Sequence, residues 1–519
     1  MLFAAVLVGA AISLTHLIFF NGIDYRDTAN VYAAMSRALV SGAYPEAFHP
    51  AIPSLNVILS RGLTLLGMAP DVAMSAVSCM FYVATIPFVY LLLKCFLPDE
   101  PAAFGTVLFA CAPKIIRFSC AGLLDSGKVF FLVAGLYFSC RLVREKFRSF
   151  GIAAGFGVAL GGLSLARSEG IGNACVLFGC TALFWLWASR REKRVLPVLP
   201  LVTTVAVWAL ALLSRVLVNG WFCGQFMYDA RVNTILKGMF EAFLHTSEPA
   251  AVPAAESAMG AEEGNALLDW LELIRKNIVG NYELYFGFAA AGVVLMVLAG
   301  YGRRRSAQGE QTSSVRDLAP CLWPDKAVPD FVKWDPFFLV LIVSVACNAV
   351  IFKLSNLDAY RYFLLNIPLF MVFTVMACWW FWRWAVKLLP RPLLRIALAG
   401  VAVILVFQVR NGVDNLFSEG TRMPVRSGLA AGEAIRAENA DGRVYFVSAS
   451  IEWYYSGAKR AIPIETAQLD CRTGTDFDYF LVCKDEDDIL PVVESRTDLR
   501  EIPLPPESTV RLFRKLKED

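Results

Sequence analysis

The sequence predicts a mainly α-helical bundle that crosses a membrane many times and carries a small α/β domain at its C-terminal end. Hydrophobic residues make up 57% of the 519 residues and charged residues only 18%, with a mean hydropathy of +0.54. The apolar residues come in runs of roughly 18 or more, which is the length that a helix needs to cross a bilayer. After about position 410 the composition becomes that of an ordinary globular domain.

The lengths of the apolar runs predict about eleven membrane spans. No basic residue precedes the first run and no small-residue cleavage site ends it, so we interpret it as an uncleaved span rather than a signal peptide. The apolar stretch 51–68 contains Pro53 and Arg61 and is predicted to lie in the interface or to be partly re-entrant. The predicted spans are 2–20, 71–96, 101–117, 122–141, 150–166, 171–188, 196–218, 284–301, 336–353, 363–385 and 393–409.

The distribution of Lys and Arg predicts the orientation of the chain. These residues are enriched in the short cytoplasmic loops of membrane proteins. The ends of the even-numbered spans are therefore predicted to be cytoplasmic, which places the N-terminus inside and the C-terminus outside. Basic clusters follow these spans at 141–148, 190–194, 303–305 and 383–395. The outer segments are then 21–70, a short turn near 117–122, a large loop at 219–283 and the C-terminal tail.

Two outer segments are predicted to contain amphipathic helices at the membrane surface. After Asp27, the residues Val31, Met35 and Leu39 recur on one helical face,. Asp is a favoured N-cap and Gly a favoured C-cap, so we expect this helix to begin after Asp27 and to end at Gly42. The loop 219–283 contains a second apolar stripe with spacings of three and four, formed by Leu268, Leu271, Ile274 and Ile278,.

Two domains are predicted, the membrane bundle at 1–410 and an α/β domain at 411–519. The second domain has short strands rich in Val, Tyr and Phe at 442–450, 478–484 and 509–516, and a helix at 426–440,. It contains Cys471 and Cys483, which form either a disulfide or two free thiols. The absence of a CxxC pair or a Cys/His cluster argues against a structural zinc site. In the fifth span, the GxxxG spacings of "GIAAGFGVALGG" predict close helix packing,.

Several polar residues stand on the predicted outer side. Asp27 follows the first span and has Asp24 nearby, His49 precedes Pro50, and Asp125 opens the fourth span in "GLLDSGKVFF". Each has an ordinary structural interpretation: Asp27 as a helix cap, His49 as a turn residue, and Asp125 as a helix-start residue beside the helix dipole.

Two further pairs lie between later spans. Arg167 and Glu169 occur in "LSLARSEG", between the fifth and sixth spans, where a local ion pair is the ordinary interpretation. Arg361 and Tyr362 occur in "DAYRYFLLNIPLF", at the start of the tenth span, where they would serve as an interfacial anchor,.

The order of these motifs resembles that of the C-type (GT-C) membrane glycosyltransferases that use polyprenyl-phosphate donors. The family includes the bacterial relatives of the protein O-mannosyltransferases and the aminoarabinose transferases. Its outer loop after the first span carries the catalytic Asp, then surface helices, then a His-Pro or Pro-Pro segment. Here these correspond to Asp27, 28–40 and His49-Pro50, with HPAIP where the family often has HPPLYP. The resemblance covers about 1–410.

The resemblance implies a GT-C fold in a bacterial inner (plasma) membrane, with a periplasmic or extracellular C-terminus. It implies that Asp27 is the catalytic residue, with Asp24 or Asp125 as an alternative base or as a contact to the acceptor or to a metal. Arg167 and Arg361 are the expected donor phosphate-binding residues, and the expected supporting residues are His49, Glu169 and Tyr362.

The chemistry of such a transfer suits these residue types. A sugar linked to a lipid phosphate has a good leaving group, so one carboxylate suffices to take the proton from the attacking hydroxyl. Arg is suited to hold the leaving phosphate. We therefore expect an inverting transfer of a hexosyl or pentosyl group from a polyprenyl-phosphate sugar donor to a lipid, glycan or protein acceptor. Membrane lipid is an expected partner and nucleic acid is not; whether a divalent metal ion takes part stays open.

Two other classes of protein remain as alternatives. A lipid or sugar transporter or flippase would show inverted repeats and polar or Gly/Pro breaks in the middle of spans, whereas the charges here cluster at span ends. A polysaccharide ligase or polymerase of another fold would place arginines and histidines in a large late outer loop. The loop 219–283 contains only one histidine, His245.

Overall fold

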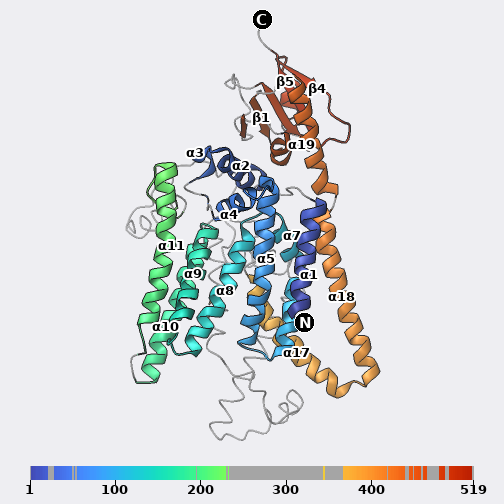
Figure 1. Ribbon diagram of the computed structural model, residues 1–519. Helices are drawn as coiled ribbons and strands as arrows, with labels where there is room; N and C mark the ends of the chain where they lie inside the picture. The colour runs from blue at the N-terminus through green and yellow to red at the C-terminus, as the bar shows by residue number, and fades with distance from the viewer. Residues whose placement is uncertain are drawn as a thin grey trace, which may run out of the picture.

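The structure is a computed structural model in which a bundle of helices carries a small β-sheet with helices at one end (Figure 1). We call this end the upper face, and the N-terminus lies toward the opposite, lower face (Figure 1). The structure describes residues 2–20, 28–49, 52, 55–193, 196–229, 232, 340, 343–344, 366–417, 419–438, 443–447, 449–456, 460–463, 478–485 and 490–516.

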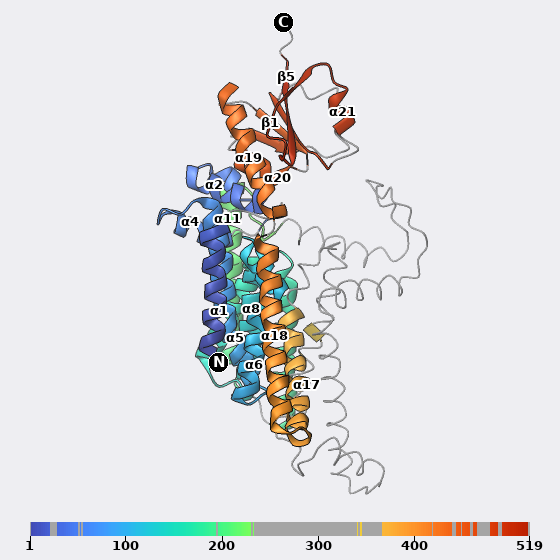
Figure 2. The same cartoon turned by 90° about the vertical axis from the view of Figure 1, so that its right-hand side faces the viewer.

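The helices of the bundle lie between the two faces, and each overlaps a predicted apolar run. Their lateral order is visible in Figures 1 and 2. They are α1 (Leu2–Thr15), which the π-helix η1 (His16–Phe20) continues, α5 (Pro70–Lys94), α6 (Asp99–Ala110), α7 (Pro113–Cys120), α8 (Asp125–Arg144), α9 (Phe150–Ala166), α10 (Gly170–Arg191), α11 (Leu199–Cys223), α17 (Asn366–Leu388) and α18 (Arg391–Phe417).

The chain is a multi-pass membrane protein by the length and apolar composition of these helices. Within the described ranges, five helices are long and apolar enough to span a bilayer, namely α5, α8, α10, α11 and α18, and the pair α6 and α7 makes a sixth. The shorter apolar helices are α9 and the segment Leu2–Ile18. The predicted spans 284–301 and 336–353 lie wholly or mostly outside the described residues, so the number eleven stays a prediction.

The predicted span 101–117 is not one straight helix. It consists of α6 and α7, whose axes differ by 54°. Pro113 explains the break, because proline has no N–H to donate to the preceding turn. At the bend, the Tyr82 hydroxyl of α5 donates a hydrogen bond to the carbonyl oxygen of Ala110 at 2.5 Å. A side chain from the interior of the bundle therefore stabilises the bend.

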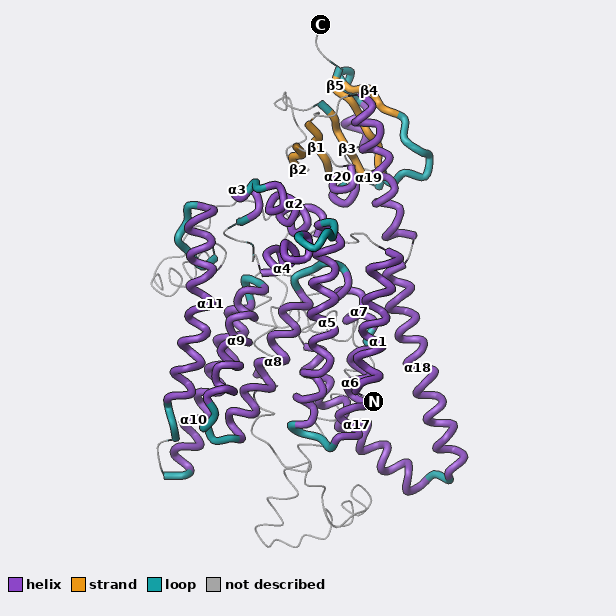
Figure 3. Tube along the Cα trace, in the orientation of Figure 1, coloured by secondary structure: helices purple, strands orange, loops and turns teal. Residues whose placement is uncertain are grey.

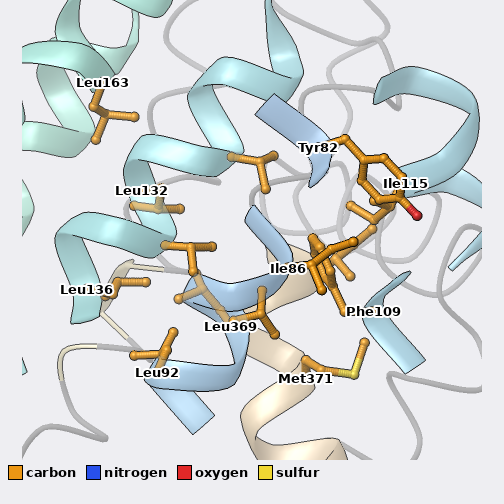
Figure 4. Packing of buried hydrophobic residues seen from close by; sticks show 14 of the residues in the cluster. Tyr82, Ile86, Leu92, Phe109, Ile115, Leu132, Leu136, Leu163, Leu369 and Met371 are labelled. Atoms are coloured by element: carbon orange, nitrogen blue, oxygen red, sulfur yellow. The ribbon is translucent and has the colours of Figure 1, made fainter. Parts of the chain in front are cut away.

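The core of the bundle is a continuous apolar cluster that joins the helices from α1 to α17. Side chains of α5, α6, α7, α8, α9 and α17 lie together in the part that Figure 4 shows. The residues labelled there are Tyr82, Ile86 and Leu92 of α5, Phe109 of α6, Ile115 of α7, Leu132 and Leu136 of α8, Leu163 of α9, and Leu369 and Met371 of α17.

The glycine spacings of α9 give the close packing that the sequence predicts. A Cβ atom on Gly157 would lie 2.7 Å from the carbonyl oxygen of Thr204, and one on Gly161 would lie 2.5 Å from the Cβ of Ala211. Both neighbours belong to α11. In the first pair, a Cβ on Gly151 would meet nothing within 4 Å, and one on Gly155 would lie 2.9 Å from the ring of Phe138 in α8, so the second pair serves the contact with α11.

Short helices cover the upper face of the bundle. They are the π-helix η2 (Thr28–Ala33), α2 (Ala34–Ser41), α3 (Tyr44–Ala47) and α4 (Leu55–Thr64). As predicted, the second of them ends at Gly42, which adopts the left-handed conformation at φ 80°. Figure 3 shows these helices beneath the C-terminal sheet.

The segment 28–41 differs from the predicted surface helix in one respect. Met35 and Leu39 are buried as expected, but Ser36, on the predicted polar side, is also fully buried. Its hydroxyl lies 2.8 Å from the hydroxyl of Ser60 in α4. A helix lying on a membrane would leave that side in water. Ser36 instead faces α4 inside the protein.

The C-terminal part is a five-stranded mixed sheet with helices. The strand order is β2-β1-β3-β5-β4; the first three strands are parallel, and β5 is antiparallel to both β3 and β4. The strands β1 (Arg443–Val447), β3 (Tyr479–Cys483) and β5 (Val510–Lys515) and the helix α19 (Glu419–Glu438) match the predicted elements. Four further elements were not predicted: β2 (Arg460–Pro463), β4 (Leu499–Ile502), α20 (Ser450–Ser456) and α21 (Leu490–Glu494).

Three sequence-based expectations are not tested by this arrangement. The predicted domain limit at 410/411 falls within α18, and the division into two domains stays a prediction. The second amphipathic stripe, at 268–278, lies outside the described residues. Cys483 ends β3, but Cys471 is not among the described residues, so the disulfide between them also stays a prediction.

The basic ends of α8 and α10 lie at the lower face, where Lys146 and Glu192 form an ion pair at 2.8 Å. The N-terminal end of α18, with Arg391 and Arg395, lies at the same face. The predicted orientation requires these basic segments to share one face, although the side of the membrane that this face meets stays a prediction.

Candidate active site

The turn that leads into α8 is held by polar side chains from three different elements. Thr28 of η2 donates a hydrogen bond to the carbonyl oxygen of Ala121 at 3.0 Å. Ser78 of α5 and Asn56 of α4 both donate to the carbonyl oxygen of Leu123, at 2.7 and 3.4 Å. All three donors are buried. This turn therefore fixes where α8 begins, and with it the position of Asp125, the first residue of that helix.

Asp125 forms a buried ion pair with Arg167. The Nη1 atom of Arg167 lies 2.7 Å from Oδ1 of Asp125, and the two side chains are 7% and 4% exposed. Arg167 is the residue that ends α9, where its extended backbone turns the chain toward α10. The geometry brings together two residues that the sequence analysis had placed in separate motifs.

The same guanidinium also binds Glu169. Its Nε atom lies 2.7 Å from Oε1 of Glu169. The Nζ atom of Lys128, one turn into α8, lies 3.2 Å from that same carboxylate oxygen. Two carboxylates and two cations thus form one buried group of four, with no net charge, which we call the charge quartet: Asp125, Lys128, Arg167 and Glu169.

Burial and charge act in opposite directions on Glu169, which lies between two spans. Its desolvation raises the pKa, but the positive charges of Arg167 and Lys128 outweigh this effect and lower the pKa to about 2. The Glu169 carboxylate is therefore ionised at any physiological pH. An uncompensated charge in such a place would cost several kcal/mol. The quartet thus exists only as a mutually neutralised unit.

A second buried ion pair is linked to the quartet through Ser168. Arg215 of α11 pairs with Asp229, whose side chain is fully buried. Ser168, between the two quartet residues Arg167 and Glu169, donates to Oδ2 of Asp229 at 2.5 Å. The backbone N–H of Val232 donates to its other oxygen at 3.2 Å. Asp229 therefore ties the segment that follows α11 to the turn that carries the quartet.

One atom of the quartet lacks a hydrogen-bond partner within the described part of the chain. It is Oδ2 of Asp125, which is buried. This oxygen is able to accept a hydrogen bond from a ligand group. The described residues supply no group of three or more His, Cys, Asp or Glu side chains that could hold a metal ion. These residues alone therefore do not fit a metal site.

Of the remaining predicted site residues, the structure describes His49. His49 is exposed on the upper face, directly after Phe48, whose ring stacks on Phe222 of α11 with the centroids 4.6 Å apart. The other predicted site residues lie outside the described residues. They are Asp24, Asp27, Arg361 and Tyr362. Thr28, the residue after Asp27, is described and reaches the turn before Asp125 through its hydrogen bond to Ala121.

Sequence reasoning missed Lys128, Arg215 and Asp229. Lys128 and Arg215 lie inside apolar spans, where an ionisable residue is costly and usually functional, so their positions carried a usable signal. Lys128 also follows Asp125 by three residues, which places the two on one face of a helix. Asp229, at the start of a long loop, gave no such signal.

Comparison with solved structures finds similar proteins. ArnT from Cupriavidus metallidurans bound to undecaprenyl phosphate matches 98% of this chain and 97% of its own length, with a TM-score of 0.59 and 14% identity. Its apo state gives the same coverage and identity and a TM-score of 0.57. The apo oligosaccharyltransferase from Archaeoglobus fulgidus matches 93% of this chain and 69% of its own, with 13% identity and a TM-score of 0.49.

Comparison of the sequence alone finds less. No protein-family model matches the chain, and no curated protein matches it. The similarity to ArnT nevertheless extends over nearly the full length of both chains. The chain therefore has the C-type membrane glycosyltransferase fold that its motifs implied.

Proposed function

We propose that this protein is an inverting glycosyltransferase that moves a sugar from a polyprenyl-phosphate donor to an acceptor at the upper face of the bundle. One observation carries the proposal beyond the fold: the neutral charge quartet is buried beside the segment that follows Asp27. Charges buried at the end of a membrane bundle are costly, and such residues usually bind a substrate or an ion.

The structural similarity to ArnT supports the proposed class of donor. The structure of ArnT contains undecaprenyl phosphate, and its fold matches this chain over nearly its whole length. A polyprenyl phosphate presents a long apolar chain to the membrane and an anionic head to its surface. The upper face, where the apolar helices end and polar side chains begin, suits both parts of such a molecule.

In the proposed reaction, Asp27 is the general base. Its carboxylate takes the proton from the acceptor hydroxyl while the hydroxyl oxygen bonds to the anomeric carbon. The bond from that carbon to the phosphate oxygen breaks, and polyprenyl phosphate leaves with the electron pair. Attack from the side opposite the phosphate inverts the anomeric configuration. Asp24 is the alternative base.

The two arginines have different proposed parts. Arg361 binds the donor phosphate directly, with Tyr362 beside it. Arg167 adds its charge to the phosphate site, but two of its nitrogen atoms already bind Asp125 and Glu169. We infer that Arg167 mainly holds Asp125 in place, and that Oδ2 of Asp125 accepts a hydrogen bond from the acceptor. His49 supports the site from the upper face.

Purified protein in liposomes tests the function. The donor is a polyprenyl-phosphate sugar labelled in the sugar, and membranes from cells that lack the gene supply the acceptor. The proposal predicts that label moves to the acceptor and that one polyprenyl phosphate is released for each sugar transferred. Arg361→Lys should weaken donor binding, because a point charge replaces a planar fork of donors.

The same assay distinguishes a transporter from the proposed glycosyltransferase. A transporter or flippase moves the intact donor across the liposome membrane and releases no polyprenyl phosphate. Translocation of uncleaved donor, with no release in the presence of acceptor membranes, would replace the glycosyltransferase by the transporter.

A further inference from the structure

Among the described residues, the short helix α20 of the C-terminal part packs against the segment that follows Asp27, and Val425 of α19 lies beside this contact. Ala29 and Ala33 of η2 are both fully buried and form one apolar cluster with Ile451 and Tyr454 of α20. The two alanines are four residues apart and have the smallest side chains that still favour a helix. Their small size lets α20 approach the backbone of this segment closely.

Arg37 of α2 adds a polar contact with Tyr454 to this apolar cluster. The guanidinium carbon of Arg37 lies 3.9 Å from the centre of the Tyr454 ring. The Nη2 atom of the same side chain donates a hydrogen bond to the carbonyl oxygen of Tyr454 at 3.1 Å. One arginine thus binds both the face of the ring and the backbone that carries it. Such a contact fixes both the distance and the rotation of α2 relative to α20.

The helix α20 is itself held firmly on its other sides. The Tyr455 hydroxyl donates to Asp71, in the first turn of α5, at 3.2 Å. Toward the domain, a Cβ atom on Gly432 of α19 would lie 2.3 Å from the carbonyl oxygen of Ser456, so α19 and α20 are in backbone contact. Arg436 of α19 also donates to that carbonyl oxygen at 3.2 Å. A movement of α20 would therefore have to move the domain as well.

The conformation of the segment indicates why it needs this support. Residues Thr28–Ala33 form a π-helix, which is rare, and short π-helical turns occur frequently at functional sites,. Such a turn persists where the surroundings impose it. The surroundings here are the turn at Ala121 on one side and α20 on the other.

We propose that Tyr454 of the C-terminal domain and Arg37 of α2 are positioning residues that hold the segment after Asp27 at the height and rotation that catalysis requires. This rests on the function proposed above, with Asp27 as the base. Neither side chain need touch substrate. Burial and the nearby charge of Asp71 raise the pKa of Tyr454 to about 12, although the charge of Arg37 acts in the opposite direction. The Tyr454 side chain is therefore neutral at physiological pH.

The test compares Tyr454→Ala, Arg37→Ala and the double variant with Tyr454→Phe in the full-length protein. Because a misplacement of about 1 Å can cost 10²-fold in rate, each alanine variant should lower kcat roughly 10- to 100-fold and leave the donor KM within about twofold. The double variant should lose less than the product of the two single losses, because both changes remove the contact between the guanidinium and the ring,. Tyr454→Phe keeps the ring and should stay within about threefold of the wild type.

Hydrogen exchange provides a readout that does not need activity. In Tyr454→Ala the amides of 28–41 should exchange about tenfold faster or more, while those of 150–166 in α9 keep their rate. Arg511→Ala is the matched control, because Arg511 lies in the same domain but pairs with Glu494 and Glu501 within it. It should change neither the exchange of 28–41 nor kcat.

Two results would overturn the proposal. One is unchanged exchange at 28–41 in Tyr454→Ala, which would mean that α20 does not hold the segment. The other is faster exchange together with unchanged kcat, which would mean that the held position is irrelevant to the reaction. A wild-type protein that shows no transfer at all would instead refute the proposed function, and the exchange data would still decide whether α20 holds this segment.

Discussion

Two arginines of this protein each bridge two carboxylates, and they do so in opposite surroundings. Arg167 joins Asp125 and Glu169 with all three side chains less than a tenth exposed. Arg511, on β5, joins Glu494 and Glu501, whose side chains are 47% and 44% exposed. Water and salt screen the second group, so its pairs contribute little to stability. The first group has no such screening, and each of its charges depends on the others.

The difference shows what each group contributes to the molecule. An exposed group such as that of Arg511 can be lost without leaving a charge in an apolar place. In the buried quartet, loss of one member leaves another unpaired, which costs much more than the pair contributed. A chain that keeps four such charges at the end of an apolar bundle therefore holds them in one geometry. That fixed geometry is what a binding site needs.

The largest expected effect on stability is that of Arg167→Ala. The change leaves Asp125 and Glu169 buried, with only Lys128 to neutralise them. We expect the free energy of unfolding to fall by about 3–5 kcal/mol. Thermal unfolding in detergent measures this, and a loss no larger than that of Arg511→Ala would remove the distinction between the two groups.

The acid stability of the protein isolates the contribution of Glu169. Its folded-state pKa of about 2 lies below its ordinary value of 4.5, so the carboxylate stabilises the fold above pH 4.5 and loses this effect as the pH falls toward 2,. The shift corresponds to a stabilisation on the order of 3 kcal/mol. Wild type should therefore exceed Glu169→Gln in unfolding temperature at pH 7, with the difference vanishing near pH 2. A difference that does not depend on pH would refute this assignment.

Two glycines extend the comparison to the backbone. Gly122 and Gly42 both have a positive φ, 70° and 80°, where a side chain costs about 1–2 kcal/mol,. A Cβ on Gly122 would also lie 2.9 Å from Cγ2 of Thr28, whereas one on Gly42 would meet nothing within 4 Å. Gly122→Ala should therefore be the more destabilising change and should also lower transfer, because it displaces the turn before Asp125. Equal effects of the two substitutions on unfolding temperature and transfer would argue against a special role for this turn.

The smallest effect is expected for the exposed group. Arg511→Ala should lower the free energy of unfolding by less than about 1 kcal/mol, and the loss should shrink further in high salt. Unfolding at two salt concentrations checks this. A loss of several kcal/mol would show that the exposed ion pairs are as tightly coupled as the buried ones.

Much of the fold could be predicted from the sequence because apolar run length alone determines where a helix can cross a bilayer. The spans from α5 to α11 and the cap at Gly42 follow from local signals of this kind. The bend between α6 and α7 also had a local signal, Pro113, but the apolar run continues through it and hides the break. The strands β2 and β4 are only four residues long and carry no alternating pattern.

The candidate site was only partly predictable for a different reason. Asp125, Arg167 and Glu169 attracted attention because charged residues interrupt an apolar sequence. That Arg167 joins both acids depends on how α8 packs against α9, and no local pattern encodes this. The same holds for two other contacts. Ser36 and Ser60 are 24 residues apart in the chain, and Arg37 and Tyr454 are 417 residues apart.

The most direct test of the proposed mechanism is the rate of sugar transfer by Asp27→Asn, with Asp24→Asn as its matched control. Asn caps a helix about as well as Asp, so the substitution leaves the helix start intact but cannot accept a proton. With Asp27 as the base, Asp27→Asn should lose roughly 10²–10⁴-fold in rate while eluting as a monodisperse protein, and Asp24→Asn should keep near-normal transfer. A well-folded Asp27→Asn protein with near-normal transfer would contradict the mechanism, and loss of activity in Asp24→Asn would then identify Asp24 as the base.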